Sequence, residues 1–225
     1  MFVKICAHTN LADALLSVEA GADAVGFVFA KSKRQVTAAQ VAGITQALPE
    51  SVKKIGVFHA RTVEEIIHDI HAAGLTGAQI HFAYDPAVIA KLRAEFGPEF
   101  FIVQTLHWVV DEDPDAAEKD FREQLKVVAK AEGIDAVLLD AKTSAASGGT
   151  GKSFDWKRAR AVLDEDAGGL KIIVAGGLTA ENVGEAIEAL HPWGVDVASG
   201  TEFMPGMKDA GKIRAFVAAA RSAKV

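Results

Sequence analysis

Eight short apolar runs rich in β-branched residues alternate with longer segments of helical periodicity, and this alternation constrains the fold more than any other feature of the sequence. The runs expected to be strands are 3–6, 24–29, 53–58, 78–81, 100–106, 136–140, 171–175 and 196–199. Runs that are apolar along most of their length are typical of a parallel sheet covered by helices. We therefore predict an α/β fold, a (βα)8 TIM barrel forming a single domain over residues 1–225; periodicity alone leaves a doubly wound open sheet as the alternative.

A short repeat precedes three of the expected strands. Gly21, Gly133 and Gly194 are each followed two residues later by Asp. Glycine adopts the left-handed backbone that commonly follows the end of a helix, so the three positions are predicted to be turns from helix to strand. In a separate acidic turn, Asp113 or Asp115 is expected to cap the helix that follows.

Composition excludes several classes of function. The chain has 225 residues, 50% of them hydrophobic, and a net charge of −6 with its 24 Lys and Arg residues dispersed. No basic surface for nucleic acid is therefore expected, and no apolar run approaches the roughly 20 residues that span a bilayer. The single cysteine, Cys6, cannot form an internal disulfide, which favours a reducing compartment, the cytoplasm.

Small residues cluster where the last three strands are expected to end. They form 148–151, 176–177 and 199–200, and a small, polar stretch at 143–151 is predicted to be a mobile active-site loop. Backbone N–H groups approach a phosphate closely only where side chains are absent, and barrels commonly bind phosphate after strands seven and eight. The predicted phosphate-binding residues are Gly149, Gly151, Gly176, Gly177, Ser199 and Gly200.

Three further side chains are expected at the same mouth of the barrel. Cys6 closes the first strand, Asp140 closes the sixth, and Arg34 lies in the loop after the second. A thiolate and a carboxylic acid there could exchange protons with opposite sides of one substrate. A guanidinium could bind a carboxylate through two hydrogen bonds.

Motifs in a fixed order extend over nearly the whole sequence. They are Val3-Lys4-Ile5-Cys6, Glu19-Ala20-Gly21-Ala22-Asp23, Lys54-Ile55-Gly56-Val57-Phe58, Gly149-Thr150-Gly151-Lys152, Ala175-Gly176-Gly177-Leu178-Thr179, Gly194-Val195-Asp196-Val197-Ala198-Ser199-Gly200 and Pro205-Gly206 with Lys208-Asp209. This set resembles the phosphoribosylanthranilate isomerase family of tryptophan biosynthesis, and the ordered combination is far more specific than any single motif.

The resemblance implies an Amadori rearrangement without cofactor or metal, converting N-(5-phosphoribosyl)anthranilate to 1-(2-carboxyphenylamino)-1-deoxyribulose 5-phosphate. Cys6 would be the general base, Asp140 the general acid, and Arg34 the group that binds the anthranilate carboxylate. Cys6 then needs electropositive surroundings in which to ionise, and Asp140 must keep its proton near neutral pH.

The sequence departs from the family pattern close to the expected site. The residues after Cys6 are Ala7-His8 where the family usually has Gly-Ile, and Phe82 replaces a glycine after His81. Lys33 and Gln35 flank Arg34 in place of Pro and Tyr, and Thr201 replaces Val. We expect His8, His81 and Phe82 to be additional residues lining the mouth.

Two alternatives remain at this point. His8, His59, His81 and His107 all fall near strand ends and, with Asp140, could ligate a divalent metal in a metal-assisted sugar-phosphate epimerase. The departures also suggest a diverged barrel that binds a phosphorylated small molecule without catalysis. The sequence is compatible with a monomer or a homodimer.

Overall fold

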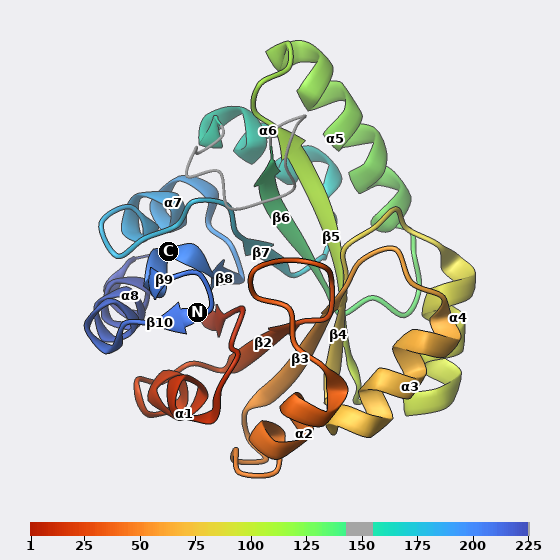
Figure 1. Ribbon diagram of the computed structural model, residues 1–225. Helices are drawn as coiled ribbons and strands as arrows, with labels where there is room; N and C mark the ends of the chain where they lie inside the picture. The colour runs from red at the N-terminus through yellow and green to blue at the C-terminus, as the bar shows by residue number, and fades with distance from the viewer. Residues whose placement is uncertain (143–154, 225) are drawn as a thin grey trace.

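The computed structural model describes residues 1–142 and 155–224, which form a closed barrel of parallel strands surrounded by helices (Figure 1). The elements are β1 (Phe2–Ile5), α1 (Leu11–Glu19), β2 (Ala24–Val28), α2 (Ala38–Thr45), β3 (Lys53–Phe58), α3 (Val63–Ala73), β4 (Gly77–Ile80), α4 (Pro86–Phe96), β5 (Phe101–Val109), α5 (Pro114–Val128), β6 (Ala136–Lys142), α6 (Trp156–Asp166), β7 (Ile172–Val174), α7 (Val183–Leu190), β8 (Gly194–Val197) and α8 (Ala210–Ser222). The predicted barrel is confirmed, and the open-sheet alternative is excluded because β8 pairs with β1.

Side chains alternate between the barrel interior and the helical layer along each strand. On β1, Val3 and Ile5 pack in the outer core beside residues of α7 and α8, whereas Lys4 lies inside the barrel. On β6, Leu138 packs in the inner core, and Asp140, two residues later, shares its side of the strand. This two-residue period directs the last inward side chain of each strand to the carboxyl-terminal mouth.

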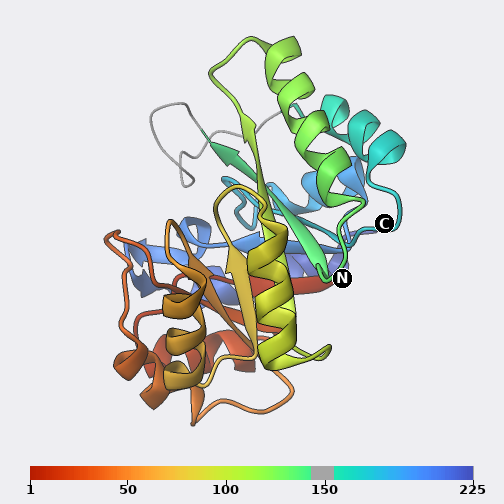
Figure 2. The same cartoon turned by 90° about the vertical axis from the view of Figure 1, so that its right-hand side faces the viewer.

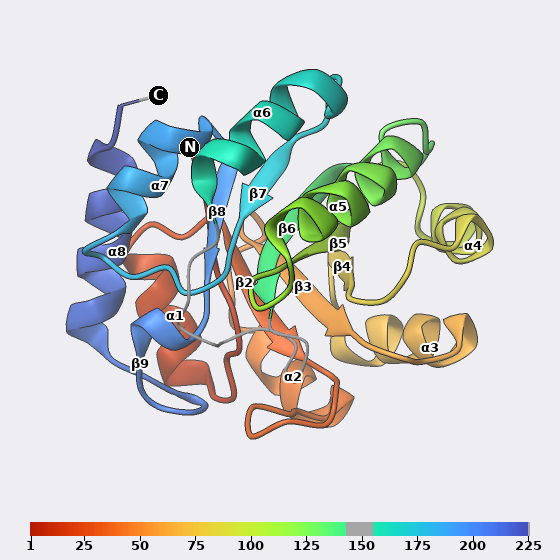
Figure 3. The same cartoon turned by 90° about the horizontal axis from the view of Figure 1, so that it is seen from above.

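Helices cover the outside of the barrel. Figure 2 shows β5 and β6 side by side with α5 outside them, and Figure 3 shows α7 and α8 along another flank. Most of these helices begin at a side-chain cap; Asp113, for example, accepts hydrogen bonds from the backbone N–H groups of Asp115 and Ala116. The predicted cap before α5 is thus Asp113.

One of the three predicted glycine turns is wrong. Gly21 and Gly133 have positive φ angles of 98° and 84°, as expected, but Gly194 is the first residue of β8. A Cβ atom at Gly194 would lie 2.8 Å from the carbonyl oxygen of Phe2, so this glycine permits close pairing of β8 with β1. His191, with φ of 45°, forms the left-handed end of α7 instead.

The region after β8 differs from the predicted strand 196–199. β8 ends at Val197, and the chain continues through a 3-10 turn, η1 (Ser199–Thr201), into an antiparallel hairpin of β9 (Glu202–Met204) and β10 (Met207–Lys208). The predicted fifth strand also ends earlier than β5, which reaches Val109. Among the described residues, no helix combines the length and apolar character needed to cross a membrane.

Candidate active site

Cys6 and Asp140 line one cavity of about 530 Å³ at the carboxyl-terminal mouth of the barrel. Arg34, His59 and His81 also line it, and each follows a different strand. Cys6 and Asp140 are 6% and 8% exposed, so the cavity gives a ligand access to groups that are otherwise buried. The structure therefore brings the predicted base, acid and guanidinium to one cavity.

Gly26 on β2 makes room for the Cys6 thiol. A Cβ atom at position 26 would lie 2.5 Å from Cys6 Sγ and 3.1 Å from its Cα. The backbone N–H of Cys6 donates to the carbonyl of Val197 on β8 at 2.8 Å, which fixes the cysteine on the other side. The thiol is thus held between β2 and β8 just beyond the end of β1.

Burial raises the pKa of the Cys6 thiol, while the Lys4 ammonium opposes this shift. Lys4 is fully buried, and its Nζ donates to Asp196 Oδ1 at 2.9 Å. Burial alone would lower the pKa of Lys4, but attraction to Asp196 and to the Cys6 thiolate raises it above the usual value. Lys4 therefore stays charged beneath the thiol and favours its ionised form.

Lys208 on β10 supplies a second buried cation near the thiol. Its Nζ donates to the carbonyl of Ala198 at 2.9 Å and to Thr201 Oγ1 at 3.1 Å. Burial lowers the pKa of Lys208 to about 8, and its positive charge lowers the pKa of Cys6. Two lysines from opposite ends of the sequence thus supply the electropositive surroundings that a thiolate requires.

Arg34 is held by a carboxylate of the β9–β10 hairpin. Its Nε and Nη2 donate to Glu202, at 2.8 Å to Oε1 and 2.6 Å to Oε2. The bond to Glu202 raises the pKa of Arg34, so the guanidinium remains charged. Burial opposes ionisation of Glu202, but Arg34 and Lys208 together lower its pKa below the usual value. The Nη1 group takes no part in this pair, and Arg34 is among the residues that line the cavity.

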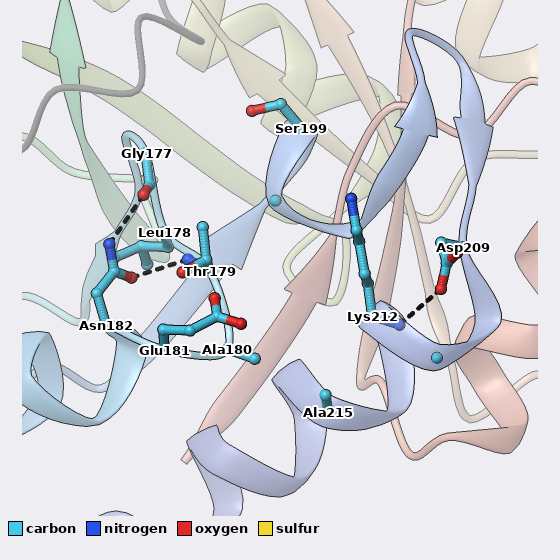
Figure 4. A pocket seen from close by; sticks show the side chains of 12 residues that line it. Gly177, Leu178, Thr179, Ala180, Glu181, Asn182, Ser199, Asp209, Lys212 and Ala215 are labelled. Atoms are coloured by element: carbon cyan, nitrogen blue, oxygen red, sulfur yellow. Dashed lines mark hydrogen bonds between the residues drawn. The ribbon is translucent and has the colours of Figure 1, made fainter.

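The loops after β7 and β8 pack against one another. Gly176 and Gly177 have φ angles of 87° and 68°, and a Cβ atom at Gly200 would lie 2.0 Å from the carbonyl oxygen of Leu178. Asn182 fixes the turn after β7: its side chain accepts from the N–H of Thr179 at 2.8 Å and donates to the carbonyl of Gly177 at 3.0 Å (Figure 4). These contacts hold the backbone of the two loops close together.

The predicted phosphate-binding residues divide between two adjoining hollows. Gly176, Gly177 and Ser199 line the cavity that holds Cys6. A neighbouring pocket of about 710 Å³ lies beside the first turns of α8 and is lined by Gly177, Ser199 and Gly200 (Figure 4). Gly149 and Gly151 lie outside the described residues, as does the whole predicted loop 143–151.

The structure corrects two of the predicted lining residues. Ala7, with φ of 69°, breaks the extended alternation after Cys6, and His8 is fully buried beside α1, where Nε2 lies 2.8 Å from Ser17 Oγ. Phe82 packs on the outer core near β4, because it is the residue after the inward-facing His81. Of the three, His81 alone lines the cavity.

The four histidines of the metal hypothesis do not gather at one point. His8 is turned away, and His59 lines the cavity with its ring 5.9 Å from that of His81. His81 and His107, with ring centroids 4.7 Å apart, do lie beside Asp140.

The sequence did not reveal the roles of Lys4, Asp196, Glu202 and Lys208. A charged residue at an inward position of an otherwise apolar strand, as in Lys4 and Asp196, is a signal that could have indicated a buried pair. The Arg34–Glu202 pair had no local signal, because its partners are 168 positions apart.

Comparison with known proteins finds similarity over nearly the full chain. Residues 3–219 match the family model described as N-(5'phosphoribosyl)anthranilate (PRA) isomerase. The chain is 40% identical to N-(5'-phosphoribosyl)anthranilate isomerase of Pelobacter propionicus, with 99% of this chain and 96% of that protein aligned. It is 38% identical to the enzyme of the same name from a Geobacter species, with 97% of each chain aligned.

Solved structures agree with the sequence comparison. Phosphoribosyl anthranilate isomerase of Thermotoga maritima superposes with a TM-score of 0.83 at 33% identity over 98% of both chains. A second structure of that name, in complex with reduced 1-(o-carboxyphenylamino)-1-deoxyribulose 5-phosphate, gives a TM-score of 0.80 at 31% identity, again over 98% of both chains.

Proposed function

Because the chain belongs to the N-(5'-phosphoribosyl)anthranilate isomerase family, we propose that it converts N-(5-phosphoribosyl)anthranilate to 1-(2-carboxyphenylamino)-1-deoxyribulose 5-phosphate with Cys6 as general base and Asp140 as general acid. It is an isomerase of tryptophan biosynthesis. The observation that carries the assignment of roles is that both groups line the same cavity from two separate strands of the barrel, after β1 and on β6.

The reaction begins with ring opening. Asp140 gives its proton to the furanose ring oxygen as the bond from that oxygen to C1 breaks, and the nitrogen lone pair forms the C1–N double bond of a protonated Schiff base. The Cys6 thiolate then removes the proton from C2, and the electrons of that bond neutralise the nitrogen and leave an enolamine. Tautomerisation of the enolamine gives the aminoketose.

The surroundings of Cys6 suit the removal of a proton from carbon. A thiol whose pKa is raised by burial gives a stronger base once it is ionised. Lys4 and Lys208 keep the ionised form accessible by opposing the effect of burial.

The two ends of the substrate have complementary partners. Arg34, held by Glu202, would bind the anthranilate carboxylate through Nη1. Backbone N–H groups near Gly176, Gly177, Ser199 and Gly200 would bind the phosphate, with Gly149 and Gly151 as further expected contacts. The bound ligand named for the related structure carries both a carboxylate and a phosphate.

The proposed roles are tested by the loss of substrate fluorescence in Cys6→Ser and Asp140→Asn. General acid–base groups contribute about 10²–10⁴ in rate, so each variant should lose turnover by that order while still binding a product analogue. Calorimetry with the analogue shows whether each cavity is intact. A variant that keeps more than a tenth of the wild-type rate would remove the role assigned to its residue.

We also propose the cytoplasm as the compartment of this reaction. The one cysteine of the sequence is a free thiol in the structure and, in its proposed role, must stay reduced to act.

A further inference from the structure

We propose that His81, His107 and Asp140 form a binding site for a divalent transition-metal ion, with Zn²⁺ as the best match, and that the ion inhibits the isomerase by occupying Asp140. One ligand atom from each of the three residues lies within 4.8 Å of the others. These residues are partly or fully buried at the mouth of the barrel, and two of them, His81 and Asp140, line the cavity.

Three neighbouring strands build this cluster. His107 on β5 is the direct partner of Asp140 on β6 in the parallel register, so the two side chains leave the sheet side by side. His81 follows β4, which pairs with β5, and its ring lies edge-on to that of His107 with centroids 4.7 Å apart. Because adjacent strands of a barrel hold these positions, the donors are already gathered before any ion arrives.

The donor set selects the kind of ion. Two imidazole nitrogens and one carboxylate oxygen are typical ligands of Zn²⁺, which binds such atoms at about 2.0–2.2 Å and takes water as a fourth ligand in an open site. Mg²⁺ and Ca²⁺ prefer sets made of oxygen atoms. Small side-chain rotations would bring three atoms that are within 4.8 Å of one another onto one ion.

Inhibition follows from the part that Asp140 plays. A carboxylate that ligates Zn²⁺ has no proton to give, so the substrate ring could not be opened by general acid catalysis. The ion would also occupy space in the cavity that the substrate needs. Metal and substrate should therefore compete, and this competition depends on the proposed function.

The binding itself is tested without substrate. Calorimetric titration of the whole, metal-free protein with ZnCl2 should show one ion per chain, and CoCl2 should give the intense visible absorption of four-coordinate Co²⁺. His107→Gln and His81→Gln should each weaken Zn²⁺ binding at least about tenfold, since each removes a direct ligand. Circular dichroism establishes that each variant is folded.

The matched control is His71→Gln. His71 also lies next to a carboxylate, with Nε2 2.7 Å from Glu95 Oε1, but it is on the outer surface in α3. This variant should bind Zn²⁺ as the wild type does. Absence of Zn²⁺ uptake by the wild type, or equal uptake by folded His107→Gln and wild type, would overturn the site.

Competition is measured in the fluorescence assay. Zn²⁺ should raise the apparent KM of the wild type, a chelator should restore it, and His107→Gln should resist the ion. Zn²⁺ that binds through His107 without affecting turnover would overturn the inhibitory role alone. Loss of the isomerase assignment, by contrast, would leave the calorimetric result standing.

Discussion

The direction of the His8 side chain depends on the backbone angle of the residue before it. Ala7 takes a left-handed φ of 69°, so His8 leaves the line of β1 and becomes fully buried near α1. Ser17 Oγ donates to the carbonyl of Asp13, so the contact between His8 and Ser17 requires a proton on Nε2 of the imidazole. Burial, reinforced by the charge of Lys208, lowers the pKa of His8 to about 3.

His8 should therefore make the fold sensitive to acid. Between its ordinary value of 6.5 and about 3, the unfolded chain binds a proton at position 8 that the folded chain does not, so stability falls as the pH falls. His8→Gln keeps a hydrogen-bond donor for Ser17 but does not titrate. Between pH 7 and about pH 4, the free energy of unfolding measured in urea should fall less steeply in the variant than in the wild type, by roughly 1.4 kcal/mol per pH unit. Equal pH slopes for both proteins would contradict the buried neutral imidazole.

At the scale of elements, the loop after β2 and the β9–β10 hairpin are joined by Arg34 and Glu202. Glu202→Gln removes the charge that orients the guanidinium but leaves the residues that exchange protons in place. We expect KM to rise about tenfold with kcat changed by less than about threefold, because the variant chiefly weakens binding of the substrate carboxylate. Steady-state kinetics separates the two constants.

A matched control for that variant lies on the helical surface. Glu165→Gln removes a carboxylate from Arg122 between α5 and α6. Neither residue is among those that line the cavity, so KM should stay unchanged. A fall in kcat with an unaltered KM in Glu202→Gln would show that the pair serves the chemical step and not the positioning of Arg34.

The sequence predicted those parts of the site that depend on where strands end. Residues 6 and 140 could be placed at one mouth because parallel strands of a barrel finish on the same side. His8 and Phe82 were misplaced because the direction of a side chain past a strand depends on the next φ angle and on register. The β9–β10 hairpin was missed because strands of three and two residues carry no usable periodicity.

The whole molecule is closed by the pairing of its first and last barrel strands. Lys4 and Asp196, 192 positions apart, form a buried ion pair across this seam. The charged inward positions could have suggested a buried pair, but their pairing with each other depends on closure of the sheet. The pair therefore combines two roles, joining β1 to β8 and placing a positive charge beside Cys6.

Lys4→Met tests both roles of Lys4. Removal of one partner of a buried ion pair costs about 3–5 kcal/mol, because Asp196 keeps a charge with no counterion. Loss of the ammonium also raises the pKa of Cys6, so the rise of kcat/KM with pH should move to higher pH. Denaturant unfolding and a pH–rate profile measure the two effects. Lys91→Met, which breaks an exposed pair with Glu64, should change neither the stability nor the pH profile. An unchanged pH profile in Lys4→Met would show that Lys4 does not control the pKa of Cys6.

The seam also sets an order of events during synthesis. Cys6 is translated before the carboxylate that anchors its lysine neighbour and before Lys208, which follow it by about 190 and 200 positions. A nascent polypeptide that still lacks its last strand would carry an ordinary thiol. Cys6 would then become able to abstract a proton in a single late step, when the barrel closes. Truncated chains would be inactive even if their other strands had paired.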